Sequence, residues 1–224
     1  MSDGEAGTYL TAGDRLLFIG DSLTDAGRDR ADRASLGDGY VSRIARALRA
    51  EAGAGPAPTV LNKGVNGHRV HDLESRWAAD VIAERPTVVT VGIGINDTWR
   101  RYDQGLVSPV AEFEASLDRV LAHTGRESAA RLVVITPFLL PATPDQERWY
   151  EDLNPRTEAA LRAARAHGAQ VVRADLLMAR AAVEIGARAL APDGVHPSAL
   201  GHDLLAEAWL TAARHAPAPR PEGS

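Results

Sequence analysis

The run Leu16-Leu17-Phe18-Ile19-Gly20-Asp21-Ser22-Leu23 joins a short apolar stretch directly to a glycine and two polar residues. Four consecutive apolar residues without polar alternation are typical of a strand that is covered on both faces. The Gly-Asp-Ser that follows is typical of a turn, and its serine can also cap a helix. The run therefore predicts a buried strand that ends in a turn carrying Ser22.

Similar apolar runs recur along the chain and alternate with longer helical patterns. The predicted strands are 16–19, 59–61, 87–93, 132–136 and 170–172. The predicted helices are 40–51, 70–84, 110–123, 155–167, 176–185 and 198–213. Asn154-Pro155 indicates an N-cap followed by a proline in the first helical position, and Gly168 indicates a helix end.

This alternation predicts an α/β protein, because parallel strands need helical crossovers of a fixed hand. The expected fold is a three-layer α/β/α sandwich around a five-stranded, mainly parallel sheet. No repeat or linker divides the 224 residues, so we expect a single domain, 1–224. We expect 1–13 and the proline-rich 216–224 to be flexible tails.

Composition excludes several classes of protein. The net charge of -5 argues against a nucleic-acid partner, because such proteins concentrate excess Lys and Arg. No apolar run is long enough to span a membrane, so no membrane association is expected. Cysteine is absent, which excludes disulfide and thiolate chemistry. Residues 1–14 contain no apolar segment typical of a secretory signal, so a cytoplasmic location is predicted.

Polar residues follow the predicted strands at the edge where ligands bind in open parallel sheets. Gly20-Asp21-Ser22 follows the first strand, 62–67 (Asn-Lys-Gly-Val-Asn-Gly) the second, and Gly94-Ile95-Asn96-Asp97 the third. Asp193-Gly194-Val195-His196 precedes the last helix. Each segment alone has an ordinary explanation as a turn or a helix cap. Together, they predict one polar site at the carboxyl edge of the sheet.

The residue types in these segments suit an acyl transfer. A serine hydroxyl is a poor nucleophile and needs a histidine base that is oriented by a carboxylate. Asp193 and His196 are three residues apart, so on a helical turn the carboxylate can reach the imidazole Nδ1–H. The negative oxygen of the tetrahedral intermediate needs preorganised N–H donors.

In their order and spacing, the four segments resemble the sequence blocks of the SGNH or GDSL hydrolase family, over nearly the whole chain. The resemblance implies a flavodoxin-like fold and a serine esterase. It makes Ser22 the nucleophile, with Asp193 and His196 completing the triad, and the oxyanion donors Ser22, Gly67 and Asn96. Gly67 is preferred to Gly64 because the family's donor glycine lies five positions after the leading asparagine. No G-x-S-x-G occurs, which argues against an α/β-hydrolase.

Several alternatives stay open for individual residues. Without the other blocks, Asn96 is equally an Asx-turn residue. Asp21 is expected to hold the turn through backbone hydrogen bonds. His68, His71 and Asp72 could suggest a metal site, but no third spaced ligand follows, and neither a metal nor another cofactor is expected. His202 is expected on the face of the last helix.

The segments 39–41, 62–64, 76–82, 94–103 and 136–138 are similar to the branch of the family that contains bacterial acetylxylan esterases. This similarity implies hydrolysis of short acetyl esters, with an acetylated sugar such as a xylo-oligosaccharide as the small-molecule partner. Trp99 and Tyr102 could form an aromatic rim that binds a sugar ring, or could pack a loop against the domain. A homo-oligomer is compatible with the sequence.

Two other functions are compatible with the same fold. A lipid-directed esterase, lysophospholipase or thioesterase would need an extended apolar groove, for which 139–141 (Leu-Leu-Pro) is the best indication. A non-catalytic binding domain would not need the nucleophile, base, acid and oxyanion donors together.

Overall fold

The structure, a computed structural model, describes residues 10–214 and is built around one parallel sheet. Its strands are β1 (Arg15–Gly20), β2 (Thr59–Gly64), β3 (Val88–Gly92), β4 (Arg131–Ile135) and β5 (Gln170–Val172). They lie in the order β2-β1-β3-β4-β5, and every neighbouring pair is parallel. This is the flavodoxin-like order, so the predicted five-stranded sheet is confirmed.

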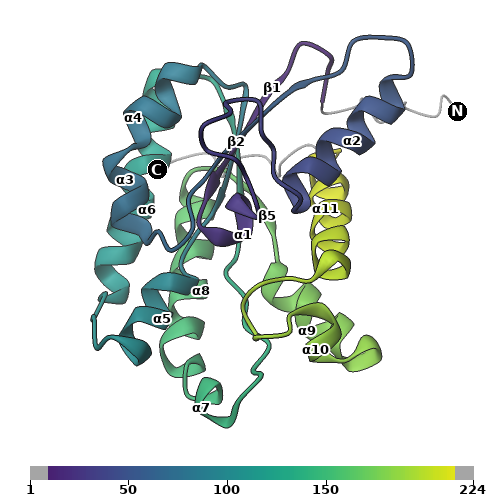
Figure 1. Cartoon of the computed structure of the whole chain (residues 1–224). Helices are drawn as coiled ribbons and strands as arrows, with labels where there is room; N and C mark the ends of the chain where they lie inside the picture. The colour runs from purple at the N-terminus through teal and green to yellow at the C-terminus, as the bar shows by residue number, and fades with distance from the viewer. Residues whose placement is uncertain (1–9, 215–224) are drawn as a thin grey trace, which may run out of the picture.

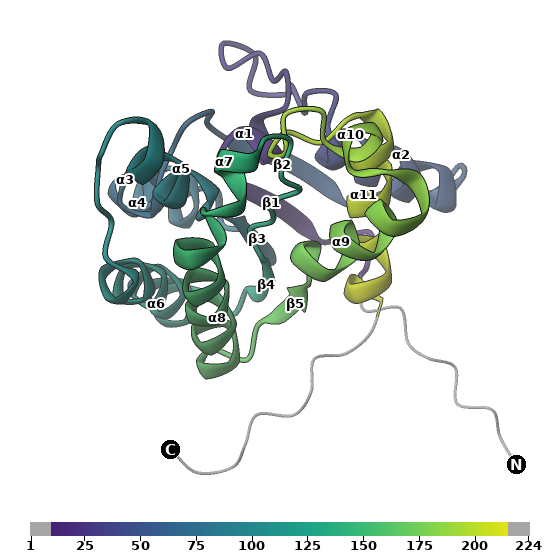
Figure 2. The ribbon, with the colours of Figure 1, turned by 90° about the horizontal axis from the view of Figure 1, so that it is seen from below.

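Helices cover both faces of the sheet (Figures 1 and 2). One face carries α2 (Tyr40–Ala52), α9 (Ala174–Ile185), α10 (Ala187–Leu190) and α11 (Ala199–Ala213). The other face carries α3 (Val70–Ser75), α4 (Trp77–Asp80), α6 (Val110–Glu127) and α8 (Tyr150–Ala166). The predicted three-layer sandwich is therefore present.

Side chains of β1 alternate between the two cores, as the period of a strand requires. Leu16 and Phe18 pack with the first helix layer, and Leu17 and Ile19 pack with the second. All four are fully buried. This explains why the run has no polar alternation: β1 is central in the sheet and has no face in contact with water.

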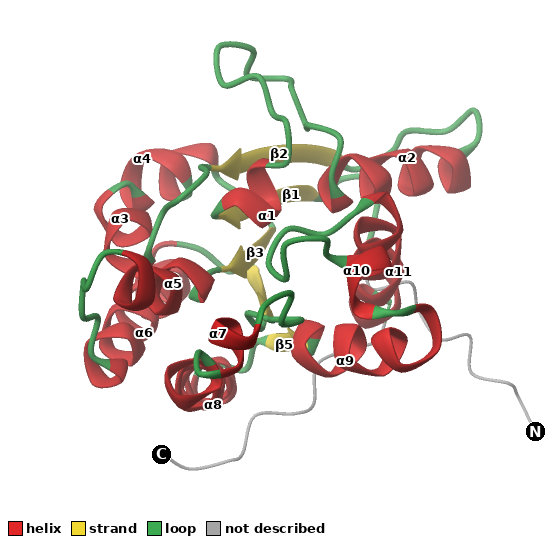
Figure 3. Cartoon of the chain, turned by 60° about the horizontal axis from the view of Figure 1, so that its bottom comes forward, coloured by secondary structure: helices red, strands yellow, loops and turns green. Residues whose placement is uncertain are grey.

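Short helices lie at the carboxyl edge of the sheet, next to the polar segments that follow the strands. They are α1 (Ser22–Asp25), α5 (Ile95–Asp103) and α7 (Pro144–Glu147). Figure 3 shows α1 beside β1 and β2, with long loops around it. These elements carry most of the residues that the sequence predicts for the site.

The segment predicted as one helix, 70–84, is divided into α3, α4 and the 3₁₀ helix η1 (Ile82–Glu84), so this prediction is wrong in detail. The first break is at Arg76, whose guanidinium donates to the carbonyl oxygens of Gly20 at 3.0 Å and Lys63 at 2.7 Å. These contacts with the ends of β1 and β2 outweigh the local preference for an unbroken helix.

The predicted start of a helix at Asn154-Pro155 is also wrong, because α8 begins at Tyr150 and contains Pro155. The additional turn is held by tertiary contacts. Leu153 packs in a small buried cluster with Ile95, and Asp152 accepts a hydrogen bond from Thr98 Oγ1 at 2.7 Å. Packing against α5 therefore offsets the backbone hydrogen bond that the proline removes.

The first residues of the predicted tail 1–13 that the structure describes are ordered. Leu10 is buried in the core, and the Thr11 N–H donates to Asp14 Oδ2 at 2.6 Å. Residues 1–9 of this predicted tail, and all of the predicted tail 216–224, lie outside the described residues.

Candidate active site

The turn after β1 places Ser22 at the first position of α1. Asp21 is the N-cap, and its Oδ1 accepts a hydrogen bond from the Leu23 N–H at 3.0 Å. Gly20 allows the turn to lie against β3, because a Cβ at this position would be 2.1 Å from the carbonyl oxygen of Gly92. Ser22 is thus fixed at the carboxyl end of β1, an interior strand of the sheet.

The side chains of Ser22, His196 and Asp193 form one hydrogen-bonded chain. His196 Nε2 lies 2.9 Å from Ser22 Oγ, and His196 Nδ1 lies 2.6 Å from Asp193 Oδ2. Ser22 is 174 residues away from His196 in sequence, so only the fold brings them together. The geometry fits a nucleophile, a base and an orienting carboxylate.

Asp193 is held as an anion beside the imidazole. Burial alone would raise the pKa of Asp193, but hydrogen bonds from the His196 ring and from the N–H groups of His196 and Val195 bring it below its usual range. The carboxylate can only accept at neutral pH, so the proton of the neutral imidazole lies on Nδ1. His196 Nε2 is then free to accept the Ser22 hydroxyl proton.

The Asp193–His196 segment is an irregular turn and not the helical turn expected from the spacing. Both N–H bonds to Asp193 Oδ1, at 2.8 and 2.9 Å, close this turn locally. Gln146 on α7 donates from Nε2 to the Asp193 carbonyl at 2.8 Å, and the Leu140 N–H donates to the Gly194 carbonyl at 2.8 Å. Two segments that are distant in sequence therefore hold this turn in place, in addition to its local hydrogen bonds.

The three predicted oxyanion donors lie on adjacent segments. The Asn66 N–H donates to Asp25 Oδ2 at 2.8 Å, which ties the turn carrying Gly67 to α1. Asn96 is buried at the start of α5, and its Nδ2 donates one hydrogen to the His68 carbonyl at 3.2 Å. Within residues 10–214, this is the hydrogen bond that Asn96 Nδ2 makes, which leaves its second hydrogen without a protein acceptor there. Gly67 has φ +82°, a left-handed conformation that suits glycine.

A buried ionic cluster holds α5, which carries Asn96, against α8. Arg156 is fully buried and donates to Asp152 Oδ2 at 2.8 Å and to Thr98 Oγ1 at 3.2 Å. Its guanidinium also lies 5.0 Å from the centroid of the Phe113 ring. Next to Asn96, Asp97 accepts from the Val70 N–H at 3.1 Å, so the start of α5 is held by α3 as well as by α8.

Asp21 has an unusual protonation equilibrium for a carboxyl. Burial raises its pKa from 3.8 to about 7, and the negative charge of Asp97 adds to the increase, against the opposing effects of the Leu23 N–H and His196. The buried carboxyl of Asp97 has a raised pKa for the same main reason. Two carboxyls behind the nucleophile are therefore harder to ionise than usual.

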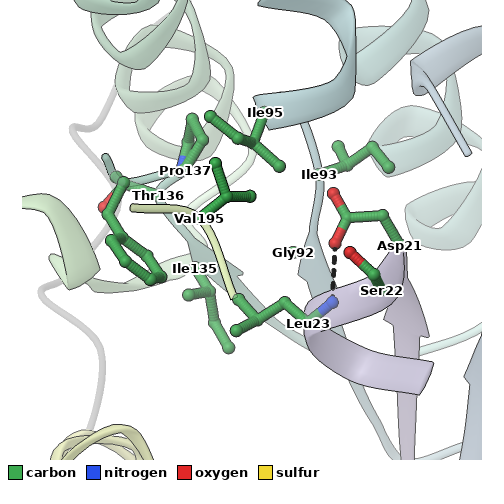
Figure 4. Close-up of a pocket in the computed structure, with 11 residues that line it drawn as sticks. Asp21, Ser22, Leu23, Gly92, Ile93, Ile95, Ile135, Thr136, Pro137 and Val195 are labelled. Carbon is green, nitrogen blue, oxygen red and sulfur yellow. Dashed lines mark hydrogen bonds between the residues drawn. The ribbon is translucent and has the colours of Figure 1, made fainter. Parts of the chain in front are cut away.

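A small apolar pocket opens at Ser22 (Figure 4). Its volume is about 10 Å³, which is room for about one water-sized group. Its lining comes from the start of α1, the ends of β3 and β4, the start of α5 and the turn before α11. The lining residues are Asp21, Ser22, Leu23, Gly92, Ile93, Ile95, Ile135, Thr136, Pro137, Phe138 and Val195.

A second pocket, of about 440 Å³, also begins at Ser22. It lies between α1, the start of α2 and the start of α11, and its lining is more polar. The lining residues are Ser22, Ala26, Gly27, Asp38, Arg43, His196, Pro197, Ala199 and His202. Ser22 is the residue that the two pockets share.

Trp99 and Tyr102 belong to a chain of aromatic rings beside the site. The centroid of the Trp99 ring is 5.8 Å from that of His196 and 5.6 Å from that of Trp149. The Tyr102 ring stacks on Trp149, and its hydroxyl donates to the Arg148 carbonyl at 2.8 Å. Trp99 therefore adjoins the predicted base, whereas the contacts of Tyr102 are those of a residue that packs the loop.

Several residues of the site carry no local signal in the sequence. Gln146 reaches the Asp193 segment only through the fold, and Asp38 lines the larger pocket from a loop before α2. His202 is on α11 as expected, but it is buried, and its Nδ1 accepts from the Tyr40 N–H at 3.1 Å. Within 10–214, no group of three or more His, Cys, Asp or Glu side chains could hold a metal ion.

The parallel sheet and the Ser22–His196–Asp193 chain are typical of a serine hydrolase, and a comparison with known protein families agrees with this class. Residues 18–204 match the model of the GDSL-like Lipase/Acylhydrolase family. The match covers most of the chain, so the protein belongs to this family and is a carboxylic ester hydrolase. No helix within the described part of the chain has the length and apolar character needed to cross a membrane.

Similar proteins show how far the similarity extends. An acetylxylan esterase from Geobacillus stearothermophilus is 34% identical over 212 residues, which are 90% of this chain and 94% of the relative. A crystal structure of an acetylxylan esterase from the same organism has a TM-score of 0.81 at 33% identity, covering 91% of this chain and 96% of that one. The structure of an α/β hydrolase enzyme from the metagenome of Lake Arreo, Spain, has a TM-score of 0.84 at 31% identity, with coverage of 92% and 98%.

Proposed function

We propose that the protein is an acetylesterase in which Ser22 forms the acyl-enzyme. Ser22 Oγ attacks the ester carbonyl carbon while His196 Nε2 accepts the hydroxyl proton, and Asp193 stabilises the resulting imidazolium. The proton then passes from His196 to the alcohol oxygen as the ester C–O bond breaks. Water, activated in the same way, releases acetate and restores Ser22.

The negative oxygen of each tetrahedral intermediate needs donors that are already in place. We propose the N–H groups of Ser22 and Gly67 and the amide of Asn96. The Ser22 N–H is at the first position of α1, where a helix has no internal acceptor for it. The link from Asp25 to Asn66, and the bond of Asn96 to the carbonyl beside Gly67, support the preorganisation that this role requires.

The size of the apolar pocket at Ser22 is the observation that carries the choice of acyl group. With only about 10 Å³ of space for a water-sized group, this pocket suits a methyl group better than a longer acyl chain. Its walls include Ile93, Ile135 and Phe138, all of which are buried. An extended groove, which a lipid-directed esterase, lysophospholipase or thioesterase would need, is not what these residues line.

We infer that the alcohol is a carbohydrate, such as a xylo-oligosaccharide. The relatives from Geobacillus stearothermophilus are named as acetylxylan esterases, which supports this choice. The position of Trp99 beside His196 also supports it, because an aromatic face can stack on a sugar ring. We assign contact with the sugar to Trp99 and support of the aromatic chain to Tyr102.

A substrate panel tests this proposal. Wild-type protein and the Ser22→Ala variant are assayed with p-nitrophenyl acetate, butyrate and octanoate, and with acetylated xylobiose. We expect a steep fall in kcat/KM from acetate to octanoate, release of acetate from the sugar, and no turnover by the variant. Equal or faster hydrolysis of the octanoyl ester would refute the acetyl preference, and an active variant would refute the role of Ser22.

Other expectations from the sequence stay predictions. These are the cytoplasmic location, the absence of nucleic-acid and membrane partners, and a homo-oligomeric state. A non-catalytic binding domain would give no turnover with any substrate of the panel, so the same assay separates that alternative from an esterase.

A further inference from the structure

The larger pocket is on the alcohol side of the reaction. The departing alcohol oxygen receives its proton from His196 Nε2, so the alcohol must lie next to the imidazole. His196 lines the larger pocket and does not line the small apolar one. The acyl group and the alcohol therefore have separate places, one on each side of Ser22.

Asp38 offers the larger pocket a free carboxylate. The side chain is exposed and has no hydrogen-bond or ion-pair partner within residues 10–214, although it lines the pocket that contains Ser22 and His196. Arg43, in the same pocket, is already occupied by Asp203 and by backbone carbonyl oxygens. Asp38 can thus accept hydrogen bonds from a ligand without first losing a partner.

The position of Asp38 is fixed relative to the nucleophile. The Asp38 N–H donates to the Ala26 carbonyl at 2.9 Å, and the Ala26 N–H donates to the Ser22 carbonyl at 2.9 Å. Gly39 brings the two segments together, because a Cβ at this position would lie 2.4 Å from the Cβ of Ala26. Two backbone hydrogen bonds therefore connect the backbone of Asp38 to that of Ser22.

His202 offers a donor in the same pocket. Its Nδ1 accepts the Tyr40 N–H, so the proton of the neutral ring lies on Nε2. Burial, with a smaller effect of Arg43, lowers the pKa of His202 to about 4, so the ring is neutral at pH 7. Among the described residues, Nε2 has no hydrogen-bond partner, and it is not fully buried. Since His202 lines the larger pocket, we take Nε2 to be accessible from that pocket.

We propose that Asp38 and the His202 Nε2–H bind hydroxyl groups of a carbohydrate alcohol while its acetyl ester lies on Ser22. One acceptor and one donor beside the apolar surfaces of Pro197 and Ala199 suit a neutral polyol, whose hydroxyl groups both donate and accept. A hydrocarbon alcohol has no hydroxyl group beyond the ester oxygen to offer the carboxylate. This inference rests on the proposed acetylesterase function and adds a specificity-determining residue, Asp38.

The test compares two substrates in matched variants. Asp38→Asn and Asp38→Ala are assayed with acetylated xylobiose and with p-nitrophenyl acetate, whose alcohol has no further hydroxyl group. We expect kcat/KM for the sugar to fall at least about tenfold in Asp38→Ala, as loss of a hydrogen bond to a charged group implies. We expect a clearly smaller loss for p-nitrophenyl acetate, whose alcohol offers no hydroxyl group to the carboxylate. For the sugar, Asp38→Asn, which keeps one acceptor oxygen, should lie between wild type and Asp38→Ala.

Glu207→Gln is the control, because it removes one exposed carboxylate from α11 outside the pocket. It should leave both substrates unchanged. An equal loss for both substrates in the Asp38 variants, or no loss for either, would overturn the subsite. If wild-type protein itself releases no acetate from the sugar, the proposed substrate fails instead, and the subsite with it.

The donor is tested without altering His202. Ser22→Ala protein with ¹⁵N-labelled histidine is titrated with acetylated xylobiose, which it cannot hydrolyse. We expect the Nε2 resonance of His202 to shift on binding, and to shift less when Asp38→Ala is added. If the Nε2 resonance of His202 does not shift when the protein is saturated with the ligand, His202 is not part of the subsite.

Discussion

The Asn96 side chain has one observed hydrogen bond and one proposed role. Its Nδ2 donates to the His68 carbonyl, and we propose that its other amide hydrogen binds the oxyanion. We expect Asn96→Ala to lower kcat by roughly 10² to 10³, since this is the cost of losing one oxyanion donor. Asn154→Ala on the exposed side of α8 is the control and should leave kcat unchanged. By the same principle, a loss below about threefold would make Asn96 a structural residue.

The buried carboxyl of Asp21 lowers the free energy of unfolding by an amount that depends on pH. Its folded-state pKa of about 7 lies above the ordinary 3.8, so folding binds a proton between these values. Wild-type stability therefore decreases as pH rises through this interval, and the full cost is present above it. Asn keeps the N-cap acceptor for the Leu23 N–H but cannot ionise.

We expect Asp21→Asn to be more stable than wild type at pH 8, by about 2 to 4 kcal/mol, and to match it near pH 4. Urea unfolding at several pH values measures both quantities. A difference in stability that does not change with pH would show that Asp21 is ionised in the folded protein throughout. A stabilising substitution beside the nucleophile would also indicate that the carboxylate is kept for function and not for folding.

Among the short elements, α7 is linked to the predicted triad by one side chain, Gln146, which also stabilises the start of its own helix. Gln146 Oε1 accepts from the Ala142 N–H at 2.7 Å, while its Nε2 donates to the Asp193 carbonyl at 2.8 Å. The first bond stabilises the start of α7, and the second holds the turn that carries Asp193 and His196. The two bonds use opposite atoms of the amide, so they can be removed separately.

We expect Gln146→Glu to keep the cap and lose the bond to Asp193, because a carboxylate cannot donate. Its kcat should fall by about fivefold, since one neutral hydrogen bond is worth about 1 kcal/mol, and its Tm should fall less than that of Gln146→Ala, which loses both bonds. Gln146→Ala should show the same loss of kcat together with a lower Tm. If kcat falls only in parallel with Tm across both variants, Gln146 acts through stability and does not position the turn.

Over the whole molecule, the sequence predicts what is local or repeated and misses what is assembled from a distance. The strands are readable because Leu16 to Ile19 and similar runs have no polar face. The site segments are readable because they follow strands that share one edge. Arg76 divides a predicted helix because it contacts Gly20 and Lys63, and no local pattern signals this. The roles of Gln146 and Asp38 likewise depend on segments that only the sheet brings together.

Glu84 connects the sheet to the segments around it. Its carboxylate lies 2.7 Å from Arg15 at the start of β1, 2.7 Å from Lys63 near the end of β2, and 2.9 Å from Arg33. Only 10% of the side chain is exposed. The hydrogen bond from Lys63, with those from Arg15 and Arg33, outweighs burial and lowers the pKa of Glu84 from 4.5 to about 2.

A lowered carboxyl pKa contributes stability that is present above the unfolded-state value and is lost as pH falls toward the folded-state value. For Glu84 the loss extends from about pH 4.5 to about pH 2. We expect Glu84→Gln to lower the free energy of unfolding at pH 7 by about 1 to 3 kcal/mol and to reduce this difference progressively below pH 4.5. Glu114→Gln removes a carboxylate from an exposed pair with Arg162 and should cost less than about 1 kcal/mol. Urea unfolding at pH 7, 4 and 3 measures both variants against wild type. Equal effects of the two substitutions would show that the three cations around Glu84 add nothing beyond an ordinary surface ion pair, and that β1 and β2 are held by the apolar cores alone.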